Sequence, residues 1–229
     1  MKFLVRSLWL VLLVWVASGC KHFEPPHVHA EDYEGRRIRV ACVGDSITHG
    51  AGVENRETNN YPTVLGVMLG GTFEVRNFGR SGATLLKTGD LPYWTTDEFK
   101  AATAWTPDVV ILKLGTNDTK PQNWKGRPAF EQDLVALLAH FQGLPHKPRT
   151  KVWVCVPVPV YETRWGINRE VMDTGVVPSI MDVCQKHKVP VIDLNDALSG
   201  HPEMFPDKIH PNAAGARLMA MTIYQAIRP

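Results

Sequence analysis

The residue types that acyl transfer requires occur in two short motifs far apart in this chain. Ser46 lies within Gly-Asp-Ser-Ile-Thr, residues 44–48, and Asp207 and His210 lie within Asp-Lys-Ile-His-Pro-Asn, residues 207–212. A serine hydroxyl is a poor nucleophile at neutral pH, so it needs a base that takes its proton and a carboxylate that orients the base. Because Asp207 and His210 are three residues apart, one tight turn can present both side chains. The two motifs predict a Ser46–His210–Asp207 triad.

Two further motifs contain candidates for stabilising the negative charge that acyl transfer places on the carbonyl oxygen. Gly79 belongs to Asn-Phe-Gly-Arg-Ser-Gly, residues 77–82, and Asn117 belongs to Gly-Thr-Asn-Asp, residues 115–118. Preorganised N–H donors must meet that oxygen. The candidate donors are the backbone N–H groups of Ser46 and Gly79 and the side-chain amide of Asn117. Glycine suits such a place because a backbone without Cβ can approach the oxyanion closely.

Short β-branched runs alternate with helical segments from residue 36 onward, which predicts parallel strands joined by helices. The expected fold is a three-layer α/β/α sandwich around a five-stranded parallel sheet. Ligands of such sheets bind beyond the carboxyl ends of the strands, where the Ser46, Gly79 and Asn117 motifs fall. The expected strands are residues 38–43, 73–77, 109–114, 152–156 and 189–193, and the expected helices are residues 61–69, 128–141, 176–188 and 212–227.

Aromatic residues outside these elements are candidates for substrate binding. Residues 87–106 show no periodicity and are predicted to form an irregular loop that covers the site. Trp94, Trp124 and Trp165 follow strands or interrupt helical patterns, where a flat apolar face could stack on a sugar ring. Core packing or loop anchoring explains each tryptophan at least as well, so both roles stay open.

Together, the four motifs resemble those of the SGNH hydrolases, also called GDSL-type esterases and lipases, over nearly all of residues 36–229. The four positions that give the family its name match Ser46, Gly79, Asn117 and His210. The resemblance implies a flavodoxin-like sandwich and ester hydrolysis through an acyl-enzyme, without a metal or other cofactor. It also implies that Asp207 is the third member of the triad.

Two stretches of the sequence resemble one subgroup of this family in particular. Residues 77–84 and 114–124 are similar to those of bacterial sialate and other carbohydrate O-acetylesterases. This similarity implies that the substrate is a small acyl ester, most simply an acetyl group on a carbohydrate. Ordinary α/β-hydrolases differ, because Thr48 occupies the place of the second glycine in their Gly-x-Ser-x-Gly motif.

Four ionisable residues near the motifs are assigned other roles. Asp45 and Asp118 adjoin catalytic positions, but each is expected to hydrogen-bond the backbone of its own loop and to fix that turn. His49 has no carboxylate partner in its motif, so His210 is the better base. Lys113 lies inside an apolar run, where an ammonium group must either pair with a carboxylate or extend outward to solvent.

The amino-terminal segment is predicted to direct export. Residues 1–19 combine two basic residues with an apolar run that ends in Ala-Ser-Gly before Cys20, as in a lipoprotein signal peptide. Cys20 would then carry the lipid, although a plain secretory signal with an incidental cysteine is the alternative. Residues 20–35 read as a tether and residues 36–229 as the hydrolase domain. Apart from this anchor, no contact with a membrane is expected.

Charge and cysteine content restrict the remaining function classes. Residues 1–19 hold two of the 25 Lys and Arg and none of the 23 Asp and Glu, so the rest carries 23 of each. Without a basic excess, nucleic-acid binding is not expected. The three cysteines beyond Cys20 fall at spacings typical of neither a metal site nor a disulfide scaffold.

Three rival functions remain to be compared with a carbohydrate acetylesterase. A lysophospholipase or thioesterase would need to bind a lipid tail, and no extended apolar segment or amphipathic helix suits that role. A carbohydrate-binding protein without turnover would lack a catalytic residue, and all are present. A metal-dependent phosphoesterase would need clustered ligands at metal-type spacing, which the sequence lacks.

Overall fold

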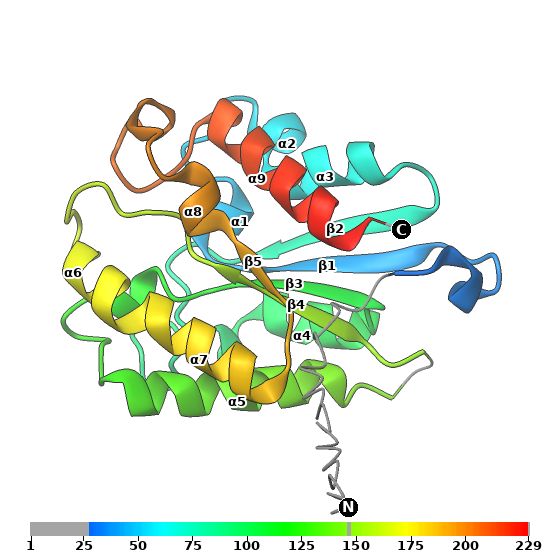
Figure 1. The fold of residues 1–229 in the computed structure, drawn as a ribbon, viewed down its shortest axis with the longest axis horizontal. Helices are drawn as coiled ribbons and strands as arrows, with labels where there is room; N and C mark the ends of the chain where they lie inside the picture. The colour runs from blue at the N-terminus through cyan, green and yellow to red at the C-terminus, as the bar shows by residue number, and fades with distance from the viewer. Residues whose placement is uncertain (1–27, 146–147, 229) are drawn as a thin grey trace, which may run out of the picture.

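A parallel β-sheet forms the middle layer of the molecule (Figure 1). The computed structural model describes residues 28–145 and 148–228. Its sheet has five strands in the order β2-β1-β3-β4-β5, all parallel, which confirms the predicted fold class. The strands are β1 (Ile38–Gly44), β2 (Phe73–Gly79), β3 (Val109–Lys113), β4 (Lys151–Val156) and β5 (Val191–Asp193).

Helices cover both faces of the sheet (Figure 1). One face carries α3 (Tyr61–Leu69), α8 (Leu194–Leu198) and α9 (Ala213–Ile227), whereas the other carries α4 (Asp97–Trp105), α5 (Arg127–Gln142) and α7 (Val177–His187). Shorter segments are α1 (Ser46–His49), α2 (Arg56–Asn59), α6 (Arg169–Val171), η1 (Ala30–Tyr33), η2 (Tyr93–Thr95), η3 (Asn117–Thr119), η4 (Met172–Val176) and η5 (Pro202–Met204). Helix α3 has the predicted bounds, and the other three predicted helices differ by a single residue at one or both ends.

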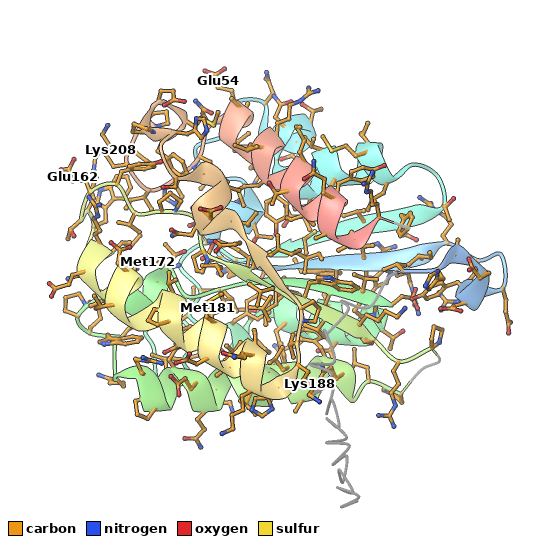
Figure 2. All side chains as sticks on the ribbon, in the orientation of Figure 1. Glu54, Glu162, Met172, Met181, Lys188 and Lys208 are labelled. Atoms are coloured by element: carbon orange, nitrogen blue, oxygen red, sulfur yellow. The ribbon has the colours of Figure 1, made fainter. Side chains whose placement is uncertain are left out.

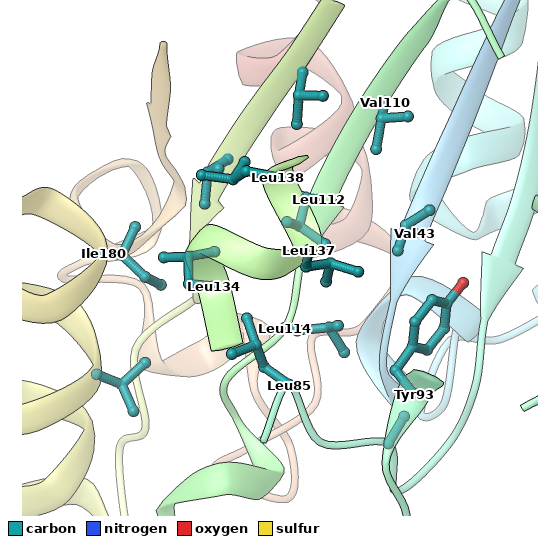
Figure 3. Close-up of a cluster of buried hydrophobic side chains, with 14 of the residues drawn as sticks. Val43, Leu85, Tyr93, Val110, Leu112, Leu114, Leu134, Leu137, Leu138 and Ile180 are labelled. Carbon is teal, nitrogen blue, oxygen red and sulfur yellow. The ribbon is translucent and has the colours of Figure 1, made fainter. Parts of the chain in front are cut away.

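Two apolar clusters, one on each side of the sheet, explain why the strands are apolar almost throughout. Successive strand residues point to opposite faces. Ala41 and Val43 of β1 therefore join the cluster under α5 and α7, while Val40 and Cys42 join the cluster under α3 and α9. Figure 3 shows the first cluster, in which strand residues meet leucines of α5. The labelled side chains include Val43, Val110, Leu112, Leu134, Leu137 and Leu138.

The prediction of an irregular loop over residues 87–106 was wrong in its second half, which forms α4. The Thr96 hydroxyl caps this helix by accepting the Phe99 N–H at 3.1 Å. Asp97 and Glu98 in the first turn also suit the positive end of the helix dipole. The helix packs against β2 and β1 instead of covering the site.

The predicted signal peptide, Cys20 and most of the tether lie outside the described residues. Within residues 28–145 and 148–228, no helix combines the length and apolarity needed to cross a bilayer.

Candidate active site

The predicted strand-end motifs lie side by side because their strands are neighbours. Gly44 at the end of β1 pairs in register with Gly79 of β2 and with Lys113 of β3. The residues that follow these positions therefore leave the sheet at one edge. The segment that precedes α9 brings His210 to the same edge, where its ring meets Ser46.

Ser46, His210 and Asp207 form a continuous hydrogen-bonded chain. Ser46 Oγ lies 2.9 Å from His210 Nε2, and His210 Nδ1 lies 2.8 Å from an Asp207 carboxylate oxygen. Both distances are within the range for hydrogen bonds between a nucleophile, its base and an orienting carboxylate. This arrangement can deprotonate Ser46 and stabilise the imidazolium that results.

A tight turn holds the Asp207 carboxylate in place, as the spacing of the motif predicts. Its second oxygen accepts the backbone N–H groups of Ile209 at 2.9 Å and of His210 at 2.7 Å. Partial burial favours the neutral acid, but these two bonds and the imidazole outweigh it and lower the pKa of Asp207. Asp207 is therefore an anion at neutral pH, as the orienting role requires.

Ser46 is the first residue of α1, and this position determines its surroundings. The Asp45 carboxylate caps the helix by accepting the Ile47 N–H at 3.0 Å. The Ser46 N–H has no hydrogen-bond partner within the described residues, as is usual in the first turn of a helix. A Cβ on Gly44 would lie 2.1 Å from Thr48 Oγ1, so only glycine fits just before this turn. The serine is thus presented beside an unused N–H donor.

The predicted oxyanion donor Gly79 uses its N–H elsewhere. That N–H donates to the Asn77 side-chain oxygen at 2.9 Å. A Cβ on Gly79 would lie 2.2 Å from the backbone nitrogen of His49, so glycine is needed here for close packing. The structure therefore gives Gly79 a packing role beside the nucleophile helix.

A second glycine of the same motif has an N–H that is unused within the part of the chain described. Gly82 has a φ of +85°, a conformation that glycine adopts without strain. The next residue, Ala83, accepts the Asn117 side-chain amide at 3.1 Å, so Asn117 lies beside the Gly82 loop. The sequence contained this alternative, since residues 77–82 include two glycines.

Beneath the nucleophile, Lys113 and Asp45 form a fully buried ion pair. The ammonium nitrogen lies 3.0 Å from each Asp45 oxygen and 2.9 Å from Thr116 Oγ1. Neither charged side chain is exposed to solvent. Burial lowers the pKa of Lys113, while the adjacent Asp45 carboxylate opposes that change. Of the two predicted alternatives, Lys113 thus pairs with a carboxylate, and Asp45 has a structural role.

Asp118 and His49 also have partners outside the triad. The buried Asp118 carboxylate accepts the backbone N–H groups of Leu85 at 3.0 Å and Leu86 at 2.7 Å. Burial raises the pKa of Asp118 to about 7. Asp118 thus fixes the segment after Gly82 instead of its own turn. The His49 ring contacts the Arg56 guanidinium, and burial together with that cation lowers the pKa of His49.

The three candidate tryptophans have different surroundings. Trp94 donates its indole N–H to Leu85 O at 2.9 Å and packs beside Phe99, which makes it a loop anchor. Trp124 packs against Gly175, where a Cβ would lie 2.6 Å from the indole. Trp165 is 56% exposed, and its ring centroid lies 6.0 Å from that of His210. Only Trp165 of these three has a ring contact with the triad within the described residues.

The fold and site define the class to which this chain belongs, the GDSL-like lipase/acylhydrolase family, whose pattern matches residues 42–218. The chain is 37% identical over 207 residues to an acetylxylan esterase of Xylanibacter ruminicola. This match covers 83% of the chain but only 43% of that relative, so the chain spans less than half of the relative's length.

Solved structures share the fold over most of the chain. An aryl esterase of M. smegmatis superposes with a TM-score of 0.70 at 24% identity, covering 82% of this chain and 97% of that one. A carbohydrate acetylesterase from Sinorhizobium meliloti superposes with a TM-score of 0.68 at 20% identity, with the same coverage of both chains. At these identities the superpositions show the common fold.

Proposed function

We propose that this chain is a serine esterase that hydrolyses acetyl esters on carbohydrates. The observation that carries the proposal is the hydrogen-bonded chain from Ser46 through His210 to Asp207, with contacts of 2.9 and 2.8 Å. Membership of an acylhydrolase family supports ester hydrolysis. The similarity to an acetylxylan esterase supports acetyl as the acyl group and a carbohydrate as the alcohol.

The geometry supports a two-step reaction. His210 Nε2 takes the Ser46 proton as Oγ attacks the ester carbonyl carbon, which forms a tetrahedral oxyanion. The carbon–oxygen bond to the sugar then breaks, and the imidazolium of His210 donates its proton to the leaving oxygen. Water attacks the acyl-enzyme with His210 again as the base, which releases acetate and restores Ser46.

We assign three donors to the oxyanion. They are the unused backbone N–H groups of Ser46 and Gly82 and the side-chain amide of Asn117. Gly82 takes the role that the motif suggested for Gly79, because the Gly79 N–H is already bonded to Asn77. An amide has two N–H groups, so Asn117 can bond Ala83 O with one and the oxyanion with the other.

Asn117→Ala is expected to reduce kcat about a hundredfold and to change KM little. Loss of one preorganised oxyanion donor costs about 3 kcal/mol of transition-state stabilisation. The variant also loses the bond to Ala83 O, so its melting temperature should be measured beside its kinetics. Unchanged turnover in a folded Asn117→Ala protein would remove Asn117 from the oxyanion site.

Substrate class can be tested with esters that differ separately in acyl length and alcohol. The purified chain should be assayed on nitrophenyl acetate, butyrate and palmitate, and on acetylated xylan and acetylated sialic acid. We expect acetate to be preferred among the nitrophenyl esters and acetate to be released from a sugar ester. A preference for palmitate would instead favour a lysophospholipase or thioesterase. Binding of the sugar esters without any hydrolysis would favour a carbohydrate-binding protein.

We also propose that the protein is exported and attached to the cell envelope by a lipid on Cys20. The support is the sequence alone, an apolar run that ends in Ala-Ser-Gly-Cys after two basic residues. Metabolic labelling with palmitate should mark the wild type but not Cys20→Ala. Equal labelling of both proteins would reject lipidation at this cysteine.

A further inference from the structure

The exposed side chain of Trp165 lies beside His210, the proposed catalytic base. Its indole is 56% exposed, and its centroid lies 6.0 Å from the His210 ring at an interplanar angle of 37°. Among the described residues, the other large apolar side chains with comparable exposure are Val67, Met181 and Met221, none of which is aromatic. Single exposed apolar residues are common on protein surfaces, so it is the position of this indole beside His210 that suggests a binding role.

The backbone at Trp165 is unusual for so bulky a residue. Arg164 and Ile167 exchange two backbone hydrogen bonds, of 3.1 and 2.9 Å, across a two-residue turn. The two central residues, Trp165 and Gly166, have φ values of +53° and +80°. Turns with positive φ at both positions favour Asn-Gly or Gly-Gly, because other side chains are strained there. A tryptophan in the first position therefore costs stability, and strain of this kind is concentrated at functional sites.

The segment that carries Trp165 is fixed to the site from several sides. The Asn168 N–H donates to Thr119 Oγ1 at 3.0 Å, and the Tyr161 N–H donates to Lys208 O at 3.0 Å. Figure 2 labels Glu162 and Lys208 close together on these two segments. The Arg164 guanidinium stacks on the indole with its carbon 4.5 Å from the ring centroid. These contacts hold the indole in one place before a substrate arrives.

We propose that Trp165 is the platform on which the sugar ring of the substrate stacks, an inference that rests on the proposed acetylesterase function. In acetylated xylan, where the acetyl groups are on ring hydroxyls, a single ester oxygen separates the carbonyl carbon from the sugar ring. When that carbonyl carbon lies at Ser46 Oγ, the sugar ring must therefore lie close to the triad. The exposed indole beside His210 offers the flat apolar face that the C–H groups of a pyranose can cover.

Trp165→Gly separates this binding role from a structural one. Glycine adopts the positive φ without strain, so the variant should melt at the same or a higher temperature than the wild type. The ratio of kcat/KM for an acetylated xylooligosaccharide to kcat/KM for ethyl acetate should fall about tenfold. Most of that change is expected in KM, and Trp165→Tyr should recover a large part of it.

The control is Met221→Ala, which removes a side chain of similar exposure from α9 and should leave the ratio unchanged. Calorimetric titration of Ser46→Ala and Ser46→Ala/Trp165→Gly with the same oligosaccharide measures binding without turnover. Weaker binding by the double variant supports the platform. If the wild type hydrolyses no sugar ester, that result counts against the proposed function but not against the platform. An unchanged ratio, equal binding by the two variants or binding by neither would overturn the platform.

Discussion

Ser46→Ala is expected to lower kcat for acetyl esters by about 10⁴- to 10⁶-fold. Without Oγ, no acyl-enzyme can form, and only binding and the oxyanion donors continue to accelerate attack by water. This reduction in kcat is larger than that expected from losing a single hydrogen bond, because the variant can react only by a different mechanism. Steady-state kinetics on nitrophenyl acetate, with a detection limit about 10⁶-fold below the wild-type rate, measure it.

The matched control for this variant is its stability. The Ser46 side chain makes a hydrogen bond only to His210 within the described residues, and the Asp45 cap of α1 does not involve it. Alanine also suits the first turn of a helix. Ser46→Ala should therefore unfold at the same denaturant concentration as the wild type. A folded variant that retains wild-type turnover would exclude Ser46 as the nucleophile.

Lys113→Met is expected to produce the largest loss of stability, about 3 to 5 kcal/mol in the free energy of unfolding. Methionine has nearly the same length but no charge, so it leaves the Asp45 carboxylate buried beside no cation. Asp45 caps the helix that begins at Ser46, so its displacement should also reduce kcat. Urea unfolding at neutral pH and steady-state kinetics measure the two effects.

The double variant Lys113→Met/Asp45→Asn tests the cause of that loss. Asparagine keeps an oxygen that can accept the Ile47 N–H but carries no charge. If an unpaired buried charge is responsible, the double variant should be more stable than Lys113→Met alone. If the double variant instead loses as much free energy of unfolding as Lys113→Met and Asp45→Asn lose in sum, the Lys113–Asp45 pair contributes no coupling energy.

The hydrogen-bonded arrangement of Ser46, His210 and Asp207 and the fold class could both be predicted from local information in the sequence. Asp207 and His210 are three residues apart, so a single turn determines their relation. The nucleophile motif directly follows β1, and the carboxyl ends of parallel strands meet at one edge of the sheet. These rules require no knowledge of side-chain packing.

Neither the partners of Lys113 nor the glycine that supplies the oxyanion donor could be predicted, because both depend on tertiary structure. The sequence shows that an ammonium in an apolar strand needs a carboxylate, but Asp45 is 68 residues away. Gly79 and Gly82 occur in one motif, and only the bond between Gly79 N–H and Asn77 shows which N–H is already used. The three tryptophans likewise have similar sequence contexts, and packing alone separates Trp165 from the other two.

Helix α4 was missed because its apolar pattern is weak. The Thr96 cap and the acidic first turn are present in the sequence, but they follow a run of turn-forming residues and aromatics. The helix buries only Ala102 fully, so no clear apolar face marks it. A threonine cap followed by two acidic residues marks the start of this helix even without apolar periodicity.

Trapping the acyl-enzyme tests the central claim most directly. The wild type should be mixed with excess nitrophenyl acetate, quenched in acid within milliseconds and examined by mass spectrometry after proteolysis. We predict that one acetyl group is attached to the peptide that contains Ser46, and that Ser46→Ala shows none. Turnover of the ester with no acetylated peptide, or acetylation at a residue other than Ser46, would contradict the mechanism.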